Sequence, residues 1–432
     1  MAFVKPFQAV MYRRDGVGDI TRFVAPPYDV INAESREALI GKDPHNVVAI
    51  DLPKGPADPT APGNRYDSAA ATWNAWREEG ILVEDPSPAI YVLEQVWEHV
   101  GRHVRRRAFI AATELHAFDE GVVLPHERTL PKAIADRLYL TRACAANLSQ
   151  VFGLFTDPAG ETDDIFEAAT HSEELLSATD ADGVVSRLWA IRDNDTLRSL
   201  QSMLADKQIF IADGHHRYTT ALAYRDERRA ADAANGITHE APPNYDFTLM
   251  ALVNMDDPDL IVLPTHRLAR ADGTFVPDLF WAGLSENFDV VEPPSGHPAA
   301  ALAAAAVPTF LVRTSDGTTR LASLRSDVDL ATAIPTDASA AWKSIDVAVL
   351  QELVLRPLLG IHPDEPSTLD RLSFVKDAHE ALKVADADVA FVLNATRMDQ
   401  LRAVAVGGET MPQKSTYFYP KLLSGLLFRA MD

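Results

Sequence analysis

Short apolar runs alternate along this chain with longer segments in which apolar residues recur at helical spacing. The short runs predict β-strands at 89–97, 103–115, 151–155, 209–212, 247–253, 260–264, 309–313, 320–324 and 388–393. The helical spacing predicts helices at 132–148, from 215 onward and at 299–306. No period of 20–50 residues repeats, so a solenoid or propeller is not expected. This alternation predicts an α/β fold of the mixed α+β kind.

Prolines indicate where the chain turns and where it divides. The proline-rich stretch 53–63 is predicted to be a surface loop, because so many prolines cannot continue a helix or a strand. The Ala-Pro-Pro-Asn sequence at 241–244 is the best candidate for a boundary. We therefore predict an N-terminal region at 1–245 and a C-terminal α/β region at 246–432 that contributes to the same pocket.

The charge limits the classes of partner. The formal net charge is −22, which argues against broad binding to nucleic acids or anionic membranes, since both need a basic face. The basic run Arg102–Arg107 lies between two predicted strands and is interpreted as the solvated edge of a hairpin. A small basic pocket for an anionic ligand remains compatible with the overall charge.

The cysteine content and the apolar segments bear on the compartment. Cys144 is the only cysteine, so an internal disulfide and a zinc site built on several thiolates are both excluded. The first residues do not form the pattern of a signal peptide. The apolar run 299–312 is interrupted by Pro308 and is too short to cross a bilayer. These features predict a cytoplasmic protein and leave its oligomeric state open.

The segment Ile-Phe-Ile-Ala-Asp-Gly-His-His-Arg-Tyr at 209–218 is expected to carry the chemistry. Its first four residues predict a buried strand, and a helix is predicted from His215. Asp213 is a favourable N-cap, and Gly214 permits a tight turn that brings the backbone close to a ligand. The unpaired N–H groups of the first helical turn, together with the helix dipole, form a ready anion site.

Side chains of the same segment strengthen this prediction. Arg217 offers a planar fork for phosphate oxygens, and His215 and His216 add donors or proton-transfer groups. A capped helix with two surface histidines is the alternative. Neighbouring helical side chains diverge by about 100°, so the two histidines are not expected to share a metal ion. The predicted phosphate- or nucleotide-binding residues are Asp213, Gly214, His215, His216, Arg217 and Tyr218.

The box Asp-Gly-His-His-Arg-Tyr resembles the phosphate-binding box of the ParB/sulfiredoxin superfamily, and most closely that of the free serine kinases (SerK). The resemblance runs nearly end to end, and the chain is similar to a broad SerK-like family of unknown function. It includes segments at 25–31, 125–129, 264–267 and 411–421. The resemblance implies a ParB/sulfiredoxin-like phosphate-binding core with an additional mixed-sheet region.

One departure from the superfamily narrows the chemistry. Sulfiredoxins carry a catalytic cysteine in this box, whereas this chain has His215 there and Cys144 far outside it. Reduction of a sulfinic acid through a cysteine is therefore not expected. ParB adds a DNA-binding helical domain, a role that the acidic charge does not support.

Two carboxylates are candidates for a catalytic base. The free serine kinases use a glutamate to deprotonate the substrate hydroxyl, which favours Glu127, and a charge complement to a helix N-terminus is the alternative. Asp29 follows the rigid Pro26-Pro27-Tyr28 and is a second candidate base or a Mg²⁺ ligand, with a structural corner as the alternative. A His-Glu-x-x-His zinc motif fails at position 130, which is Leu, and no protein metal site is predicted.

The segment 411–421 combines lysines with hydroxyl side chains, which suits phosphate or carboxylate binding, and a half-buried strand is the alternative. His266 and Arg267 follow the predicted strand at 260–264 and are candidates for the same pocket. The predicted catalytic residues are Glu127, Asp29 and His216. The predicted substrate-binding residues are Tyr28, His126, His266, Arg267, Lys414, Ser415 and Thr416.

The leading hypothesis from the resemblance is a small-molecule kinase. The donor would be ATP or ADP, or pyrophosphate, bound at 213–218 with Mg²⁺ offsetting its charge. The acceptor would be a free hydroxy amino acid, L-serine, giving O-phosphoserine. One alternative is a non-catalytic or weakly hydrolytic nucleotide-binding regulator of the ParB-like type, and another is a phosphatase or nucleotidase that uses water. The expected partners are a small-molecule substrate and a nucleotide.

Overall fold

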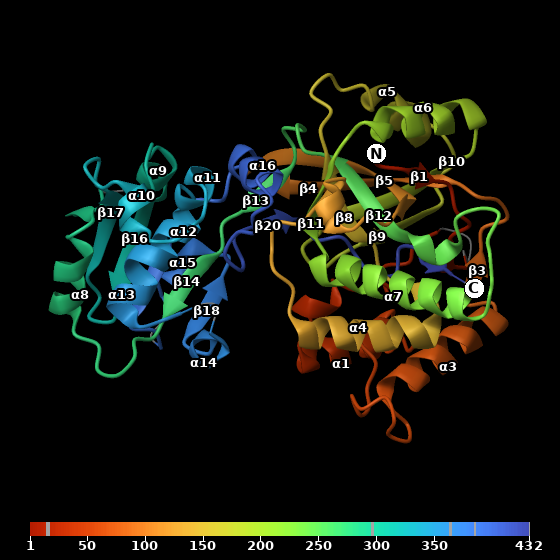
Figure 1. Cartoon of the computed structure of the whole chain (residues 1–432), viewed down its shortest axis with the longest axis horizontal. Coiled ribbons are helices and arrows are strands. Elements are labelled where there is room, and N and C mark those ends of the chain that lie inside the picture. Colours follow the sequence, from red (N-terminus) through yellow and green to blue (C-terminus); the bar gives the residue numbers. More distant parts are fainter. Residues whose placement is uncertain (14–17, 295–297, 363–364, 384–385, 432) are drawn as a thin grey trace. The chain divides into compact units, whose positions relative to one another are not determined.

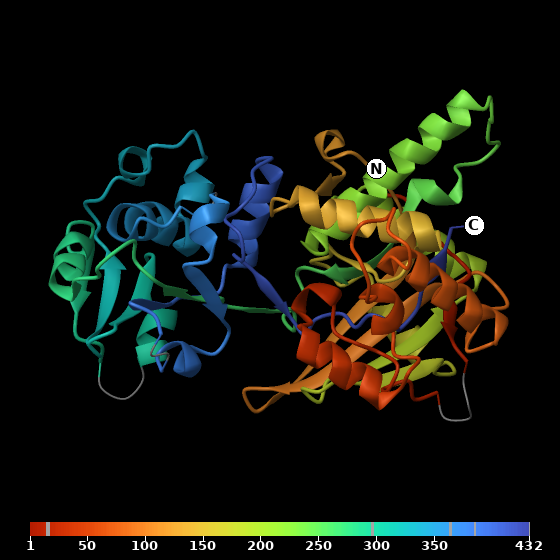
Figure 2. The ribbon, with the colours of Figure 1, turned by 90° about the horizontal axis from the view of Figure 1, so that it is seen from below.

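The chain divides into two compact units. A computed structural model describes residues 1–13, 18–294, 298–362, 365–383 and 386–431. Unit 1 comprises Met1–Pro125, Thr129–Leu260 and Pro420–Asp432, and unit 2 comprises His126–Arg128 and Ile261–Tyr419. Both ends of the chain belong to unit 1 (Figure 2).

This division differs from the predicted cut at 245/246. Strand β12, Phe247–Asn254, lies between β5 and β8 in the large sheet of unit 1, so unit 1 continues to Leu260. The last segment, Pro420–Asp432, also returns to unit 1. A single cut in the sequence cannot describe a chain that passes between its units several times.

Unit 1 is built on a mixed sheet, nine-stranded within the described residues. Strands β12 and β8 run parallel, whereas β4, β5 and β10 form antiparallel neighbours. The prediction of a mixed α/β fold is confirmed. The strands in sheet order are β6 Val123–Leu124, β11 Ile209–Asp213, β8 Val151–Phe155, β12, β5 Arg102–Glu114, β4 Ile90–His99, β10 Val185–Ile191 and β9 Leu176–Thr179, with β1 Val4–Lys5 paired to β5.

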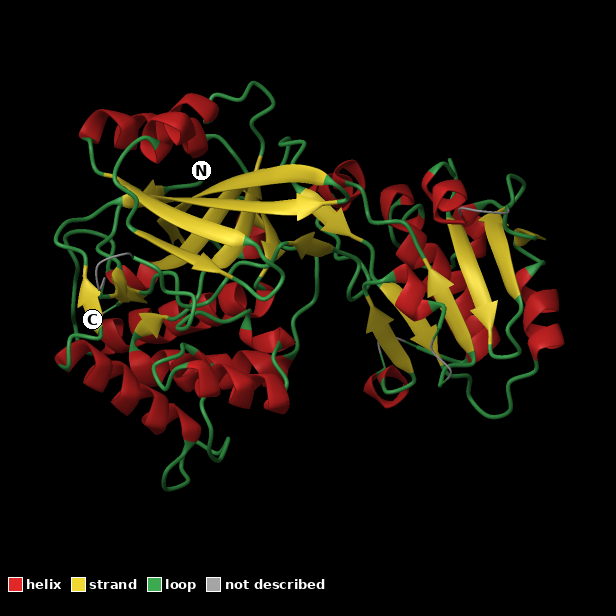
Figure 3. Ribbon diagram, turned by 180° about the vertical axis from the view of Figure 1, so that it is seen from behind, coloured by secondary structure: helices red, strands yellow, loops and turns green. Residues whose placement is uncertain are grey.

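Helices cover both faces of this sheet. Helices α4 and α7 lie side by side on one face, and α5 and α6 lie on the other (Figure 1). Figure 3 shows these layers from behind, with the strands in yellow. The helices are η1 Tyr28–Val30, α1 Ala33–Lys42, α2 Val48–Asp51, α3 Arg65–Glu78, η2 Phe118–Glu120, α4 Pro131–Cys144, α5 Asp163–Thr170, α6 Asn194–Ala205, α7 His215–Ala234 and η3 Asn244–Asp246. Two strand pairs complete the unit, β2 Val10–Tyr12 with β3 Leu82–Glu84, and β7 Ala146–Asn147 with β21 Arg429–Ala430.

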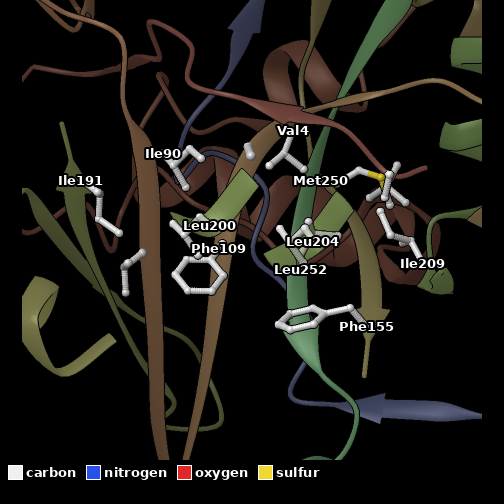
Figure 4. Close-up of a cluster of buried hydrophobic side chains, with 14 of the residues drawn as sticks. Val4, Ile90, Phe109, Phe155, Ile191, Leu200, Leu204, Ile209, Met250 and Leu252 are labelled. Carbon is white, nitrogen blue, oxygen red and sulfur yellow. The ribbon is translucent and has the colours of Figure 1, made fainter. Parts of the chain in front are cut away.

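Residues of β11 pack in the apolar core of unit 1, where Ile209 lies near Met250 and Leu252 (Figure 4). Gly153 in β8 makes this packing possible. A Cβ at Gly153 would lie 2.8 Å from Leu252 Cδ2 and 2.9 Å from Ile209 Cγ2. Protein interiors are packed as densely as organic crystals, so these contacts fix the position of the strand that precedes the predicted anion turn.

Unit 2 contains a smaller sheet, six-stranded in the part of the chain that the structure describes, in which the neighbouring strands are antiparallel. Its strands in sheet order are β15 Phe288–Val291, β17 Thr319–Leu324, β16 Thr309–Thr314, β19 Val389–Val392, β14 His266–Ala269 and β18 Leu372–Val375, and β13 Ile261–Leu263 pairs separately with β20 Tyr417–Tyr419. Its helices are α8 Pro277–Leu284, α9 Pro298–Ala303, α10 Leu330–Ala333, α11 Ala340–Lys343, α12 Asp346–Leu350, the π-helical η4 Gln351–Leu355, α13 Arg356–Leu359, α14 Pro366–Leu369, α15 Ala378–Ala381 and α16 Met398–Val406.

Two local predictions need correction. The helix predicted over 132–148 ends at Cys144, because Ala145 adopts a left-handed conformation with φ 45°. The basic run Arg102–Arg107 forms the start of β5 and pairs with β4 in a hairpin, whereas β12 pairs with β5 only from Phe109 onward, so the run lies at a hairpin edge as predicted. The correction concerns Arg106, which is buried and not solvated. Among the helices of the described segments, none is long and apolar enough to span a bilayer.

Candidate functional site

The turn between β11 and α7 lies in unit 1. Strand β11 ends at Asp213, Gly214 turns the chain with φ 89°, and α7 begins at His215. The prediction that Asp213 is the N-cap is wrong, because Gly214 occupies that position. No side-chain hydrogen bond caps α7 among the described residues. The first-turn N–H groups of a 20-residue helix are therefore left for water or a ligand.

The carboxylate of Asp213 binds two cations instead of capping the helix. Arg217 Nη2 donates to Asp213 Oδ2 at 2.7 Å, and Lys421 Nζ donates to Asp213 Oδ1. Burial opposes ionisation of Asp213, but Lys421 and Arg217 outweigh this effect and hold the pKa of Asp213 well below its usual 3.8. Asp213 is thus an anion at any physiological pH, and it is shared between two positive charges.

Glycine at position 214 also determines where the Arg217 side chain lies. A Cβ at Gly214 would lie 2.8 Å from Arg217 Nε and 3.0 Å from Cζ, so the guanidinium packs directly over the glycine. Arg217 Nη1 donates to the backbone oxygen of Gln150, next to β8. The turn and the end of β8 together position this guanidinium.

Arg106 of β5 adds a third cation near the turn. Its side chain is 1% exposed, and Nη2 donates to the backbone oxygen of Pro420 at 2.6 Å and to Gln95. Nε and Nη1 have no hydrogen-bond partner within the described residues. Burial lowers the pKa of Arg106 to about 9, an effect that the charges of Asp257 and Asp213 oppose.

Sequence reasoning missed Arg106, and it included Lys421 only as part of the candidate segment 411–421 without naming it as a site residue. Strand alternation could have identified Arg106, because successive side chains of a strand point to opposite faces. Arg105 and Arg107 pair with Glu167 on α5, whereas Arg106 is buried. Lys421 lay within the segment 411–421, but its place beside Asp213 depends on a contact between residues 208 positions apart.

The other predicted residues of the turn differ in their surroundings. His215 is 6% exposed, and its charge helps to lower the pKa of Asp213. His216 Nε2 accepts a hydrogen bond of 2.9 Å from the N–H of Leu130, which precedes α4. This contact ties His216 to the start of α4, and a proton-transfer role for His216 stays a prediction.

Tyr218 does not fit its predicted role in phosphate binding. Its side chain is fully buried in the core of unit 1. Its hydroxyl accepts from the N–H of His116 at 3.0 Å and donates to the oxygen of His116 at 2.9 Å. A helix presents successive residues to different faces, which places Tyr218 in the core although its neighbour Arg217 reaches Asp213.

Tyr28 and Asp29 also belong to unit 1. They lie in η1, and the Arg137 guanidinium stacks 4.1 Å from the centre of the Tyr28 ring. Burial raises the pKa of Tyr28 to about 12, an effect that the charges of Arg137 and Arg217 oppose. The Asp29 side chain is exposed. Tyr28 therefore lies within electrostatic range of Arg217.

The remaining predicted residues lie in unit 2. His126 Nε2 and Thr416 Oγ1 are 2.9 Å apart, and the His126 oxygen accepts from the N–H of Met411 at 2.8 Å. Ser415 donates from its hydroxyl to the oxygen of Pro412. These contacts fold the segment 411–416 around a buried histidine.

Arg267 and His266 stabilise the same segment of unit 2. Arg267 is 2% exposed, and Nη2 donates to the oxygen of Lys414 at 2.9 Å, while Nη1 donates to the oxygen of Thr265. Burial lowers the pKa of Arg267 to about 9, and the charge of Glu127 opposes this shift. His266 Nδ1 accepts from the N–H of Leu393 at 3.2 Å, and burial together with Arg267 lowers the pKa of His266 to about 4.

The predicted site residues thus form two sets. Those in unit 1 are Tyr28, Asp29, Asp213, Gly214, His215, His216, Arg217 and Tyr218, and those in unit 2 are His126, Glu127, His266, Arg267, Lys414, Ser415 and Thr416. Lys414 is exposed and adopts φ 57°. In the described ranges, no group of three or more His, Cys, Asp or Glu side chains is placed to hold a metal ion.

Comparisons with known proteins give weak structural similarities. A variant of a free serine kinase in complex with ADP is 11% identical, with a TM-score of 0.33 over 69% of this chain and 84% of that one. A conserved hypothetical protein from Pyrococcus furiosus is 12% identical, with a TM-score of 0.32 over 70% and 89% of the two chains. SbnI from Staphylococcus aureus, truncated at its C-terminus, is 11% identical, with a TM-score of 0.34 over 72% and 85%.

A search of curated proteins finds no match to the chain. Comparison with protein-family models gives a firmer result. A family model described as "Protein of unknown function (DUF1015)" matches residues 4–348. This match covers most of the 432 residues, including the β11–α7 turn and most of unit 1. The chain therefore belongs to the DUF1015 family.

Proposed function

We propose that unit 1 binds the phosphates of a nucleotide at the β11–α7 turn, and that the chain transfers a phosphoryl group to a free hydroxy amino acid. The proposed acceptor is L-serine, which would give O-phosphoserine, and the proposed donor is ATP or ADP, or pyrophosphate. The observation that carries the proposal is the group of three cations, Arg217, Lys421 and Arg106, near the carboxylate of Asp213, with the charge of Asp257 also acting on Arg106.

The balance of charge at this turn favours an anionic ligand. Two cations share Asp213, and Arg106 adds a buried guanidinium with two nitrogens that lack partners among the described residues. A phosphate would compensate this positive charge and accept hydrogen bonds from the uncapped N–H groups of α7. The same cations would stabilise the charge on a transferred phosphoryl group, the main catalytic requirement of such reactions.

The base and Mg²⁺ belong to the proposal. Asp29, exposed in unit 1, and Glu127, near the charge of Arg267 in unit 2, are the two candidates for deprotonating the acceptor. Both oxygens of Asp213 bind cationic side chains. Mg²⁺ commonly binds through substrate phosphates and one or two carboxylates, so it would enter with the nucleotide rather than into a preformed protein cage.

The test is to incubate the full chain and Mg²⁺ with L-serine and ATP, ADP or pyrophosphate, and to measure O-phosphoserine by mass spectrometry. We expect product with at least one donor. Arg217→Gln and Lys421→Met should each lower kcat/KM by about 100-fold, a typical loss when one group that stabilises transition-state charge is removed. Glu127→Gln and Asp29→Asn, measured separately, should identify the base.

Arg142→Gln and Lys54→Met serve as matched controls. Arg142 is 42% exposed and pairs with Glu227, and Lys54 is 66% exposed and pairs with Glu37. Both changes remove a positive charge away from the turn and should leave the rate unchanged. Absence of product with every donor contradicts the kinase. Phosphate release without serine would indicate a hydrolase, and nucleotide binding without turnover would indicate a regulator.

A further inference from the structure

Gln150 directly precedes β8 in unit 1 and contacts both cations that share Asp213, one of them through the chain that carries it. Gln150 is 1% exposed. Its backbone oxygen accepts from Arg217 Nη1, and its side-chain Nε2 donates to the backbone oxygen of Leu423 at 3.0 Å. Leu423 follows Lys421 by two positions. A single residue therefore holds Arg217 directly and holds Lys421 through its segment.

The segment 420–423, which carries Lys421, forms neither a helix nor a strand. Side chains of unit 1 bind its backbone on both sides of the lysine. Arg106 donates to the first backbone oxygen of the segment at 2.6 Å, and Gln150 donates to the last. A lysine stem is flexible, so a fixed backbone reduces the freedom that the ammonium loses when it binds Asp213.

A β-bulge places Asp213 close to Gln150 along the sheet. The pairing of β11 with β8 changes register between Ile211 and Asp213, and Asp213 is opposite Phe152. Phe152 follows Gln150 by two positions. Bulges redirect side chains and are frequent next to active sites. The shared carboxylate is therefore presented from the strand pair that begins at Gln150.

Stability alone does not explain an amide at position 150. Nε2 binds the segment 420–423, but Oε1 is buried and has no hydrogen-bond partner within the described residues. A buried acceptor without a donor costs at least as much as one hydrogen bond gains. A methionine of similar length would fill the same space without this cost. The benefit of the amide is therefore the position of the segment rather than the stability of the fold.

We propose that Gln150 is a positioning residue of the anion site in unit 1. Its backbone oxygen fixes Arg217, and its amide fixes the segment of Lys421, so both cations keep their places on the two oxygens of Asp213 and bind an anion as one unit. Gln150 itself acts through these cations and not on the anion. This inference rests on the proposed function, because the anion is the phosphate proposed there.

Acetylation of lysines in the full chain tests the positioning without any ligand. Acetic anhydride modifies an accessible, deprotonated amine, and the ion pair with Asp213 protects Lys421. In Gln150→Met, which loses the donor, the rate at Lys421 should rise at least about threefold, because the reagent reaches only the open form. Lys54, 66% exposed, is the internal reference, with mass spectrometry as the measurement. An unchanged rate at Lys421 overturns the proposal.

Gln201→Met is the matched control. Gln201 Nε2 also donates to a backbone oxygen, that of Val4 at 2.8 Å, elsewhere in unit 1. This change should leave the rate at Lys421 as it is, and equal release of Lys421 by both methionine variants overturns the proposal. Gln150→Asn is one methylene shorter and should also release Lys421, so it replaces Gln150→Met if that variant does not fold.

Calorimetry with pyrophosphate tests whether the positioning serves anion binding. Gln150→Met should weaken binding about tenfold in the otherwise unchanged chain, but less than about twofold in Lys421→Met, because the amide acts through Lys421. Equal weakening in both backgrounds overturns the proposal. A general loss of folding would also weaken binding equally in both, so the double-mutant comparison separates positioning from stability.

The outcome is separable from that of the proposed function. If the unchanged chain binds neither pyrophosphate nor nucleotide, while Gln150→Met still releases Lys421, the positioning is supported and the phosphate site is contradicted. If the unchanged chain binds pyrophosphate, but Gln150→Met changes neither this binding nor the acetylation of Lys421, the phosphate site is supported and the positioning is overturned.

Discussion

In unit 1 the charged side chains of the candidate site bind one another as well as the backbone, whereas in unit 2 Arg267 and His266 bind the backbone. Asp213 accepts from Arg217 and Lys421 at the start of α7. Arg267 donates to the backbone oxygens of Thr265 and Lys414, and His266 accepts from a backbone N–H. In the first arrangement a charged ligand can replace one partner of an ion pair. In the second, removing a partner leaves a buried backbone group unsatisfied.

This difference distinguishes arginines that can bind a ligand from arginines that stabilise the fold. A guanidinium that holds a loop through carbonyl oxygens has used its donors for the fold. A guanidinium that shares a carboxylate with a lysine can also bind a phosphate, because the lysine keeps the carboxylate paired. Mutation of the unit 1 cluster, Asp213 with Arg217 and Lys421, should therefore mainly change ligand binding. Mutation of the Arg267 cluster, Arg267 with the backbone oxygens that it binds, should mainly lower the unfolding free energy.

Replacement of Arg267 should have the largest effect on stability. Arg267→Met leaves the oxygens of Thr265 and Lys414 without their donor, and we expect unit 2 to lose about 3 kcal/mol of unfolding free energy. Hydrogen exchange of amides in β14 and β19 would measure this loss, since exchange reports stability locally. Pyrophosphate binding to unit 1 should be unchanged.

Arg270→Met is the matched control for this experiment. Arg270 is exposed and donates to the backbone oxygen of Asp386 at 2.7 Å. Its loss should cost no more than about 1 kcal/mol, because water can replace an exposed donor. Equal effects of the two substitutions, or loss of pyrophosphate binding in Arg267→Met, would contradict the division between the clusters.

Replacement of Asp213 should change how the unfolding free energy of unit 1 depends on pH in the acid range. Lys421 and Arg217 hold the folded pKa of Asp213 below the usual 3.8, so its stabilising contribution is present above pH 3.8 and is lost as pH falls through the folded pKa. Asp213→Asn should lower stability by about 2 kcal/mol at neutral pH and remove this pH dependence. It should also tighten pyrophosphate binding, because both cations lose their internal anion. Urea unfolding at several pH values between neutral and pH 3 would measure both effects on stability. If the unfolding free energy of Asp213→Asn fell with pH as steeply as that of the unchanged chain, this assignment would be contradicted.

Replacement of His266 should act in a different pH window and in unit 2. Its folded pKa is about 4, below the usual 6.5, so the unfolded state binds a proton first as the pH falls. The contribution of neutral His266 is therefore present above pH 6.5 and is lost between 6.5 and about 4, by about 2 kcal/mol. His266→Asn keeps an acceptor for the N–H of Leu393 and should flatten this slope for amides of β14. His103→Asn, 87% exposed in unit 1, should not.

The strands were the part of this structure that the sequence predicted best. The predicted strand at 151–155 has the bounds of β8, and the strand at 209–212 lacks only the last residue of β11. Both are short apolar runs buried in a central sheet, where burial alone specifies the conformation. The predicted strands at 309–313 and 320–324 each lack one residue of β16 and β17, which pair as antiparallel neighbours.

The surroundings of the polar residues were much harder to predict from the sequence. Asp213 has the residue type of an N-cap, and only the left-handed Gly214 excludes it from that position. Tyr218 and Arg217 are adjacent in sequence, but Tyr218 is buried in the core whereas Arg217 pairs with Asp213. Arg106 is an arginine like its neighbours Arg105 and Arg107, so residue type alone does not show that it is buried. Lys421 reaches Asp213 only because the chain returns to unit 1 at Pro420. Such assignments depend on tertiary contacts that a local pattern does not contain.

A comparison of the two ends of α7 gives the smallest and most specific test. Gly214 and Gly236 flank the helix and both have positive φ, 89° and 65°. Each substitution to alanine should cost about 1 kcal/mol from backbone strain alone. At Gly236 the added Cβ meets nothing within 4 Å among the described residues, whereas at Gly214 it would displace the Arg217 guanidinium. Gly214→Ala should therefore weaken pyrophosphate binding about tenfold beyond any effect of Gly236→Ala, with calorimetry as the measurement. Equal binding in the two variants would mean that Arg217 can leave its place over Gly214 without loss, and that the guanidinium does not contact the anion.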